Sequence, residues 1–149
     1  MNISPLIDIV EDLNCELTQA ERFKRLVLAI QRAIPCDVVA LLKLNDGYLV
    51  PVATLGLKDE ALARQFAIEQ HPRLQHILSN SQITRFDSDS DLADPYDGLV
   101  QDGSDQLHIH DCMGSTILID GKPWGVLTLD AMQAGSFSAL DPIETRAYI

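Results

Sequence analysis

The sequence predicts a single α+β domain in which helices flank a central antiparallel sheet. Helical periodicity dominates the first 34 residues, whereas two hairpin signals, Asn45-Asp46-Gly47 and Asp120-Gly121, each lie between two runs of β-branched and aliphatic residues. The expected order of elements is helix, helix, hairpin, helices, long loop, hairpin and helix. A length of 149 residues suits one such domain and is too short for two complete cores.

Two amphipathic helices are expected at the start of the chain. In the first, apolar residues recur three or four positions apart, at Leu6, Ile9, Val10, Leu13 and Leu17. The run Thr18-Gln19-Ala20-Glu21 then has the form of a capping box, in which the Thr18 and Glu21 side chains satisfy free backbone N–H groups at a helix start. We therefore expect a second helix that ends near Pro35.

The middle of the chain predicts the two hairpins and the helices between them. The first hairpin spans residues 37–53, and residues 58–66 and 71–80 have helical patterns. Residues 83–86 form a short candidate strand. The second hairpin joins residues 114–119 to residues 123–129.

Two later segments bear on function and on domain organisation. A polar stretch of 25 residues runs from Asp87 to Asp111, which is longer than a compact domain normally uses without a functional reason. The run Asp141-Pro142-Ile143-Glu144 has the N-cap and first-turn proline of a last helix. Because the chain stops at Ile149, before that helix is complete, we expect it to be a fragment of a longer protein.

The charge and hydropathy of the chain exclude two classes of partner. Eleven basic and 22 acidic side chains give a formal net charge of −11 at pH 7, which opposes binding to nucleic acid or to an anionic membrane. Apolar runs such as the one from Val38 to Leu42 are too short to cross a bilayer, and the N-terminus lacks the basic segment of a secretory signal. We therefore expect a soluble protein in the cytoplasm.

The three cysteines, Cys15, Cys36 and Cys112, are widely spaced and contain no CxxC pair. This pattern is not typical of a disulfide framework or of a zinc knuckle. We expect reduced thiols, with Cys15 and Cys36 acting as small buried apolar side chains.

The polar stretch and the second hairpin carry side chains with metal-ligand chemistry. Asp94 and Asp97 are three residues apart, which places both carboxylates on one face of a helical turn. His110 and Cys112 are two residues apart, so on a strand they point to the same side. Asp130 follows the last strand and is expected near Cys112 at the open end of the hairpin. The pattern predicts that oxygen, nitrogen and sulfur donors converge on one metal ion.

Mixed donors of this kind favour ferrous iron over magnesium or calcium, which prefer oxygen ligands. Zinc stays open, although structural zinc sites normally use four cysteine or histidine ligands. An interpretation without metal also stays open. In it, Asp94 and Asp97 are helix caps, His110 is an ordinary strand histidine, Cys112 is a buried apolar residue and Asp130 is a turn residue.

An enzyme is the third class of function to be considered. Cys112 and one of His71, His108 or His110 could act as nucleophile and base, but no accompanying motif supports this pairing. No G-x-G-x-x-G or Walker loop occurs either, so a nucleotide site of those kinds has no support. We expect no catalytic activity.

Four runs together resemble one family: His71-Pro72-Arg73-Leu74, the run from Asp89 to Leu99, His110-Asp111-Cys112-Met113-Gly114, and the run from Leu127 to Met132. They resemble the N-terminal GAF domain of NorR-type nitric oxide sensors, which are bacterial enhancer-binding regulators of anaerobic nitric oxide detoxification. The resemblance extends over essentially the whole chain. Its most specific part is Asp94-Pro95-Tyr96-Asp97-Gly98.

The resemblance implies a GAF fold and a mononuclear non-haem ferrous iron. The implied ligands are Asp94, Asp97, His110, Cys112 and Asp130, with Arg73 as a further participant and Tyr96 beside the site. Three carboxylates and one thiolate around Fe²⁺ leave a charge of −2. Because a guanidinium has no free lone pair, we expect Arg73 to balance this charge rather than to ligate the iron.

The resemblance also implies a regulatory function without substrate turnover. Nitric oxide would bind the iron, and the resulting change would relieve inhibition of an attached ATPase domain and so activate transcription of nitric oxide detoxification genes. The ATPase domain and a C-terminal DNA-binding domain would lie outside residues 1–149, which would form the sensor domain, and a second copy of the chain is a further candidate partner. The alternative is a GAF domain that binds a small organic ligand or serves as a dimerisation module without metal.

Overall fold

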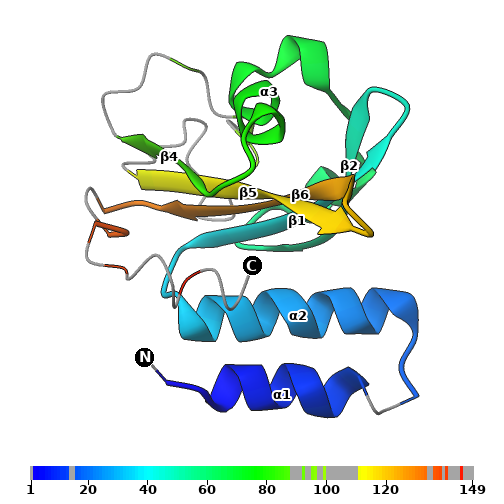
Figure 1. Ribbon diagram of the computed structural model, residues 1–149, viewed down its shortest axis with the longest axis vertical. Helices are drawn as coiled ribbons and strands as arrows, with labels where there is room; N and C mark the ends of the chain where they lie inside the picture. The colour runs from blue at the N-terminus through cyan, green and yellow to red at the C-terminus, as the bar shows by residue number, and fades with distance from the viewer. Residues whose placement is uncertain are drawn as a thin grey trace.

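The centre of the molecule is a six-stranded antiparallel sheet with the strand order β3-β2-β1-β6-β5-β4 (Figure 1). The computed structural model describes residues 2–13, 16–87, 92, 95–96, 99, 111–133, 136–138, 140 and 145. The strands are β1 (Val38–Asn45), β2 (Tyr48–Leu55), β3 (Phe66–Ala67), β4 (Thr84–Asp87), β5 (Asp111–Ile119) and β6 (Lys122–Ala131). The prediction of helices around a central antiparallel sheet is confirmed.

The helices lie on both faces of this sheet (Figure 1). They are α1 (Ser4–Leu13), α2 (Gln19–Ala33) and α3 (Pro72–Ser79), with two short 3₁₀ turns, η1 (Asp59–Ala63) and η2 (Ile68–Gln70). Helix α3 covers one face, and α2 covers the other with α1 packed outside it. Among the described residues, no helix is both long and apolar enough to span a membrane.

The predicted capping box at the start of α2 is present. The Thr18 hydroxyl accepts a hydrogen bond from the backbone N–H of Glu21 at 3.2 Å, and the Glu21 carboxylate accepts one from the backbone N–H of Thr18 at 2.9 Å. These hydrogen bonds lower the pKa of Glu21. They satisfy two N–H groups that a helix leaves without an intrahelical partner.

We expect Thr18→Ala to lower the free energy of unfolding by about 1 kcal/mol, because it removes the hydroxyl that caps α2. Urea denaturation followed by circular dichroism measures this change. Gln19→Ala, at the exposed neighbouring position, is the matched control and should leave the midpoint nearly unchanged. Equal midpoints for the two variants would mean that the capping box contributes little.

Both predicted hairpin turns have the backbone geometry that their sequences require. Asp46 and Gly47 have φ values of 46° and 80°, and Asp120 and Gly121 have φ values of 53° and 74°. Two successive residues in the left-handed region form the turn whose twist matches that of the flanking strands. The two hairpins, β1–β2 and β5–β6, are joined by the pairing of β1 with β6 at the centre of the sheet.

The helix predicted over residues 58–66 is only partly correct. The segment forms the five-residue 3₁₀ turn η1, and Phe66 instead begins the short strand β3, which pairs with β2. The Phe66 side chain is buried in the core, and its backbone pairs with β2 at the edge of the sheet instead of continuing a helix. Most of the long polar stretch lies outside the described residues. The predicted helix from Asp141 also lies almost wholly outside them.

The sheet separates two hydrophobic cores. Successive residues of a strand point to opposite faces, so β5 and β6 contribute alternately to each core. On the α3 side lie Cys112 and Val126 with Leu74 and Ile77 of α3. The core on the α2 side is built by Val27 and Ile30 of α2 with sheet residues that include Met113, Leu127 and Leu129.

Candidate functional site

Cys112 and Asp130 lie directly opposite each other on the paired strands β5 and β6. Directly opposed residues of an antiparallel pair point to the same face, with Cβ atoms about 4.5–5.5 Å apart. Both side chains are buried: Cys112 is 4% exposed and Asp130 is 0% exposed. The prediction that Asp130 lies near Cys112 at the open end of the hairpin is therefore confirmed.

This pair lies on the α3 face of the sheet. Cys112 belongs to the core beneath α3, and Gly114, two residues further on, faces Ile77 of α3 so closely that an added Cβ would lie 2.5 Å from its Cδ1 atom. Thr116 donates a hydrogen bond to the carbonyl oxygen of Ile77 at 3.0 Å. Helix α3 is therefore held tightly against the strand that carries the thiol.

Tyr96, which the resemblance implies to lie beside the site, contacts the strand that carries Asp130. Its side chain is 1% exposed, and its hydroxyl shares a 2.7 Å hydrogen bond with the hydroxyl of Thr128. Thr128 precedes Asp130 by two residues on β6, so both point to the α3 face. The Tyr96 ring also packs edge-on against Phe66, with the ring centroids 5.7 Å apart. Tyr96 therefore attaches part of the polar stretch to the strand that carries Asp130.

Arg73 lies in the first turn of α3 and is 8% exposed. Its Nε–H donates a hydrogen bond to the carbonyl oxygen of Leu92 at 2.8 Å, and its guanidinium carbon lies 5.2 Å from the centre of the Phe86 ring. Phe86 on β4 is directly opposite Cys112 on β5. The structure thus places a cation over Phe86, the residue that is paired with Cys112.

Sequence reasoning missed two residues of this site, Thr128 and Phe86. Thr128 carried a usable signal, because polar residues two apart on β6 share the face of Asp130. Phe86 carried no such signal, since its contact with Arg73 depends on how α3 packs over β4.

Three of the predicted ligands, Asp94, Asp97 and His110, lie outside the described residues. Within the described part of the chain, no group of three or more histidine, cysteine or acidic side chains is arranged so that it could hold a metal ion. The structure therefore brings together Cys112 and Asp130, with Tyr96 and Arg73 nearby, and leaves the remainder of the predicted set as a prediction.

Cys36 differs from Cys112 in its surroundings. Burial, followed by the nearby carboxylates of Asp130 and Asp37, raises the pKa of the Cys36 thiol to about 12. Of the two described cysteines, Cys112 is the predicted ligand, and it is the one directly opposite Asp130 on the paired strands.

The enzyme hypothesis requires a histidine that acts as a base toward Cys112. His71, the candidate that the structure describes, gains no support for this role from its surroundings. His71 packs edge-on against the Phe66 ring, with the centroids 5.3 Å apart, and burial lowers its pKa. His108 and His110 lie outside the described residues.

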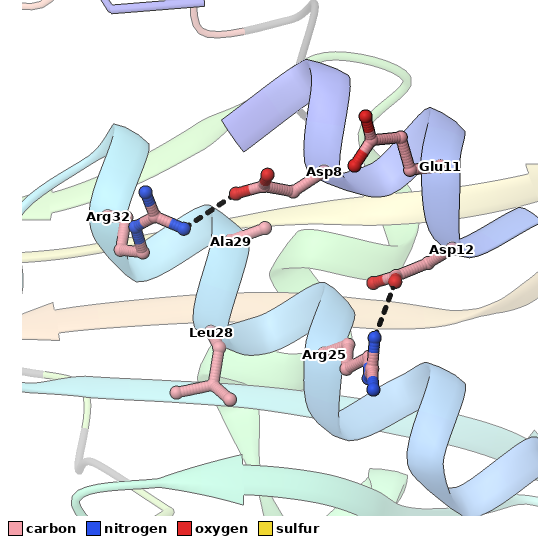
Figure 2. A pocket seen from close by; sticks show the side chains of 7 residues that line it. All are labelled: Asp8, Glu11, Asp12, Arg25, Leu28, Ala29 and Arg32. Carbon is pink, nitrogen blue, oxygen red and sulfur yellow. Dashed lines mark hydrogen bonds and ion pairs between the residues drawn. The ribbon is translucent and has the colours of Figure 1, made fainter. Parts of the chain in front are cut away.

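A separate hollow of about 340 Å³ lies on the other side of the sheet, between α1 and α2 (Figure 2). Its charged side chains form two ion pairs across the helices, Arg32–Asp8 at 2.6 Å and Arg25–Asp12 at 2.8 Å. Exposed pairs of this kind contribute little to stability. The hollow is distinct from the Cys112–Asp130 pair, and its lining contains neither cysteine nor histidine.

The Cys112–Asp130 pair combines a sulfur donor with an oxygen donor on the same face of two paired strands. Placing a carboxylate at 0% exposure in a protein core is costly unless a cation or hydrogen bonds compensate its charge. A borderline divalent ion such as Fe²⁺ accepts both donor types. The residues present therefore fit the predicted iron.

Two relatives of this chain are named as transcription regulators. It is 46% identical to the nitric oxide reductase transcription regulator NorR1 of Cupriavidus necator, over 133 residues that make up 89% of this chain and 26% of that protein. It is 42% identical to the anaerobic nitric oxide reductase transcription regulator NorR of Vibrio vulnificus, over 144 residues that make up 97% and 28%. The chain thus spans about a quarter of the length of these relatives. Their names agree with the expectation that it is not an enzyme.

The fold has counterparts among solved structures. The GAF domain of a phosphoenolpyruvate-protein phosphotransferase from Coxiella burnetii superimposes with a TM-score of 0.77 at 18% identity, covering 98% of this chain and 84% of that one. At that identity the likeness concerns the fold alone. The GAF domain family matches residues 19–145, which include β5, β6 and the Cys112–Asp130 pair. The chain is therefore a member of the GAF domain family, and it is similar to the GAF-containing nitric oxide reductase transcription regulators.

Proposed function

We propose that this chain is the sensor domain of a transcription regulator that responds to nitric oxide through one bound ferrous iron. The observation that carries the proposal is the buried Cys112 thiol directly opposite the buried Asp130 carboxylate. The similarity to regulators named for nitric oxide reductase supports the choice of signal.

Cys112 and Asp130 would hold the iron from the sheet, and Asp94, Asp97 and His110 would complete the ligand set. When bound, ferrous iron supplies an electron-rich centre with which nitric oxide combines reversibly. The strands hold the two sheet donors opposite each other before any metal arrives, since β5 and β6 are continuously paired from the Asp111–Ala131 pair to the Ile117–Gly125 pair. Preorganisation of this kind reduces the cost of ordering ligands around a metal.

The surrounding residues would tune the charge and access of the site. The positive charge of Arg73 lowers the cost of burying an ion set whose net charge is −2. The rings of Phe86 and Tyr96 exclude water from the α3 face, since both are buried. Such outer contacts orient metal ligands and control solvent access.

The proposed output is a change in an attached ATPase domain. Residues 1–149 would form one GAF sensor domain in the cytoplasm, where thiols stay reduced, and the remainder of the regulator would hold the ATPase and DNA-binding domains. Binding of nitric oxide shifts the domain between two states only if its affinity for them differs. Relief of ATPase inhibition is then the consequence of that shift.

The test is anaerobic reconstitution with ferrous iron, followed by desalting, metal analysis and titration with nitric oxide under electron paramagnetic resonance. We expect about one iron per chain and a high-spin signal that rises with added nitric oxide. A protein that retains no iron would overturn the proposal and favour the alternative, a metal-free GAF domain that binds an organic ligand or dimerises. Iron without a response to nitric oxide would overturn the assignment of the signal.

A further inference from the structure

Asp111 and Cys112 are neighbours on β5 and therefore point to opposite faces of the sheet. Cys112 faces α3, whereas Asp111 lies on the same face as Met113, a member of the core beneath α2. Asp111 is not among the predicted ligands, although its side chain is completely buried, at 0% exposure.

The carboxylate of Asp111 holds two other segments. Its Oδ1 and Oδ2 atoms accept hydrogen bonds from Nε and Nη2 of Arg85, at 3.0 and 2.8 Å, in a bidentate arrangement. Its Oδ2 atom also accepts a hydrogen bond from the backbone N–H of Phe137 at 2.9 Å. One buried side chain on β5 therefore joins β4 to the segment that follows β6.

This arrangement is sensitive to the loss of any member. Charge-assisted, bidentate hydrogen bonds are stronger and more directional than neutral ones. Removing one partner leaves a buried donor or a buried charge without compensation, which costs more than the hydrogen bond contributes. The Phe137 ring is itself 4% exposed and packs in the core beneath α2, so the segment is fixed by both its backbone and its side chain.

The same alternation occurs on β4. Phe86 faces the candidate site, lies opposite Cys112 and receives the guanidinium of Arg73, whereas the adjacent Arg85 reaches Asp111 on the other face. On β5, Asp111 is the neighbour of Cys112. On β4, Arg85, which binds Asp111, is the neighbour of Phe86. We call Asp111, Arg85 and Phe137 the Asp111 cluster. A shift of either strand at the site must move this cluster.

We propose that Asp111 is a positioning residue that couples the Cys112–Asp130 pair on one face of the sheet to residues 136–138 on the other. Nitric oxide as the trigger rests on the proposed function, whereas the coupling itself rests only on the contacts of Asp111. The segment after β6 then responds to a change at the site, although it lies on the other face of the sheet.

The first test uses the metal-free chain and hydrogen exchange of the Phe137 amide at pH 7. Arg85→Gln should accelerate this exchange about tenfold, because it removes the bidentate cation that holds the Asp111 carboxylate. Arg85→Lys should restore part of the protection. The matched control is Arg32→Gln, which breaks an exposed ion pair between α1 and α2 (Figure 2) and should leave the Phe137 amide unchanged. Equal exchange in Arg85→Gln and wild type would overturn the coupling.

The second test adds ferrous iron and nitric oxide. In the wild type, Phe137 exchange should change when the electron paramagnetic resonance signal of bound nitric oxide appears. In Arg85→Gln the signal should persist while the change in exchange is lost, which a residue that only maintained the fold would not produce. A signal without any change at Phe137 in the wild type would overturn the coupling. Absence of the signal would instead overturn the proposed function, and the metal-free comparison would still decide the role of Asp111.

Discussion

Asp130→Asn should lose most of the bound iron, from about one ion per chain to a small fraction after desalting, and with it the response to nitric oxide. The change keeps the size of the side chain and removes the anionic oxygen that faces Cys112 across the β5–β6 pair. Cys112→Ser should have a similar effect, because a hydroxyl is neutral at pH 7 where a thiolate ligand is required. Metal analysis and electron paramagnetic resonance of the anaerobic protein measure both effects.

Each of these variants has a matched control in the same chain. Asp120→Asn makes the same chemical change at the exposed turn of the same hairpin, where asparagine tolerates the positive φ of 53°. Cys36→Ser makes the same change at the other described cysteine, which is not among the predicted ligands. Retention of iron by Asp130→Asn would remove Asp130 from the ligand set, and retention by Cys112→Ser would remove Cys112. Equal loss of iron in the controls would mean that the effect is not specific to this pair.

Arg73 variants should separate a charge partner from a ligand. Arg73→Lys should keep most of the iron and of the nitric oxide signal, although it loses the Nε–H bond to Leu92 and the planar group over Phe86. Arg73→Asp should lose both, because it adds a fourth carboxylate to a site whose net charge is already −2. The measurement is iron content and spectrum for these variants beside Cys112→Ser.

The control for Arg73→Asp is Arg64→Asp, which makes the same change of charge at an exposed position. Circular dichroism of the metal-free proteins and the milder Arg73→Gln separate a loss of iron from a loss of folding. If Arg73→Lys lost as much iron as Cys112→Ser, Arg73 would do more than supply charge, and we would replace its assigned role with direct ligation or a strictly geometric one.

Local chemistry explains why much of the fold was predictable. The Thr18 capping box and the Asp120-Gly121 turn are encoded within four residues, and both occur as predicted. The helix expected over residues 58–66 failed because the buried Phe66 is drawn to the edge of β2, a contact that no local pattern contains. Long-range pairing overrides a weak local preference in this way.

In the candidate site, too, local sequence accounts for some features and packing between distant segments for others. The β5–β6 hairpin and its turn could be predicted from the sequence alone, and this places Cys112 and Asp130 near its open end. Their direct opposition also depends on the register shift between Ile117 and Leu118, which no local pattern predicts. The positions of Arg73 above Phe86 and of Tyr96 beside Thr128 depend on packing between segments that are 13 and 32 residues apart. Only the family resemblance indicated Arg73 and Tyr96, and only the three-dimensional structure shows which residues they contact.

The alternation of faces along β5 and β6 restricts how this hairpin can evolve. Even-numbered positions such as Cys112 and Asp130 serve the site, and odd-numbered positions such as Met113 and Leu129 serve the opposite core. A substitution can therefore alter the chemistry of one face while the other is inherited unchanged. Between the register shift at Ile117/Leu118 and the open end of the hairpin, a single inserted or deleted residue would exchange the two sets unless a second bulge absorbed it. Methionine or leucine would then lie in the site and the ligands beneath α2. These strands can accept new residue types far more readily than a new residue count.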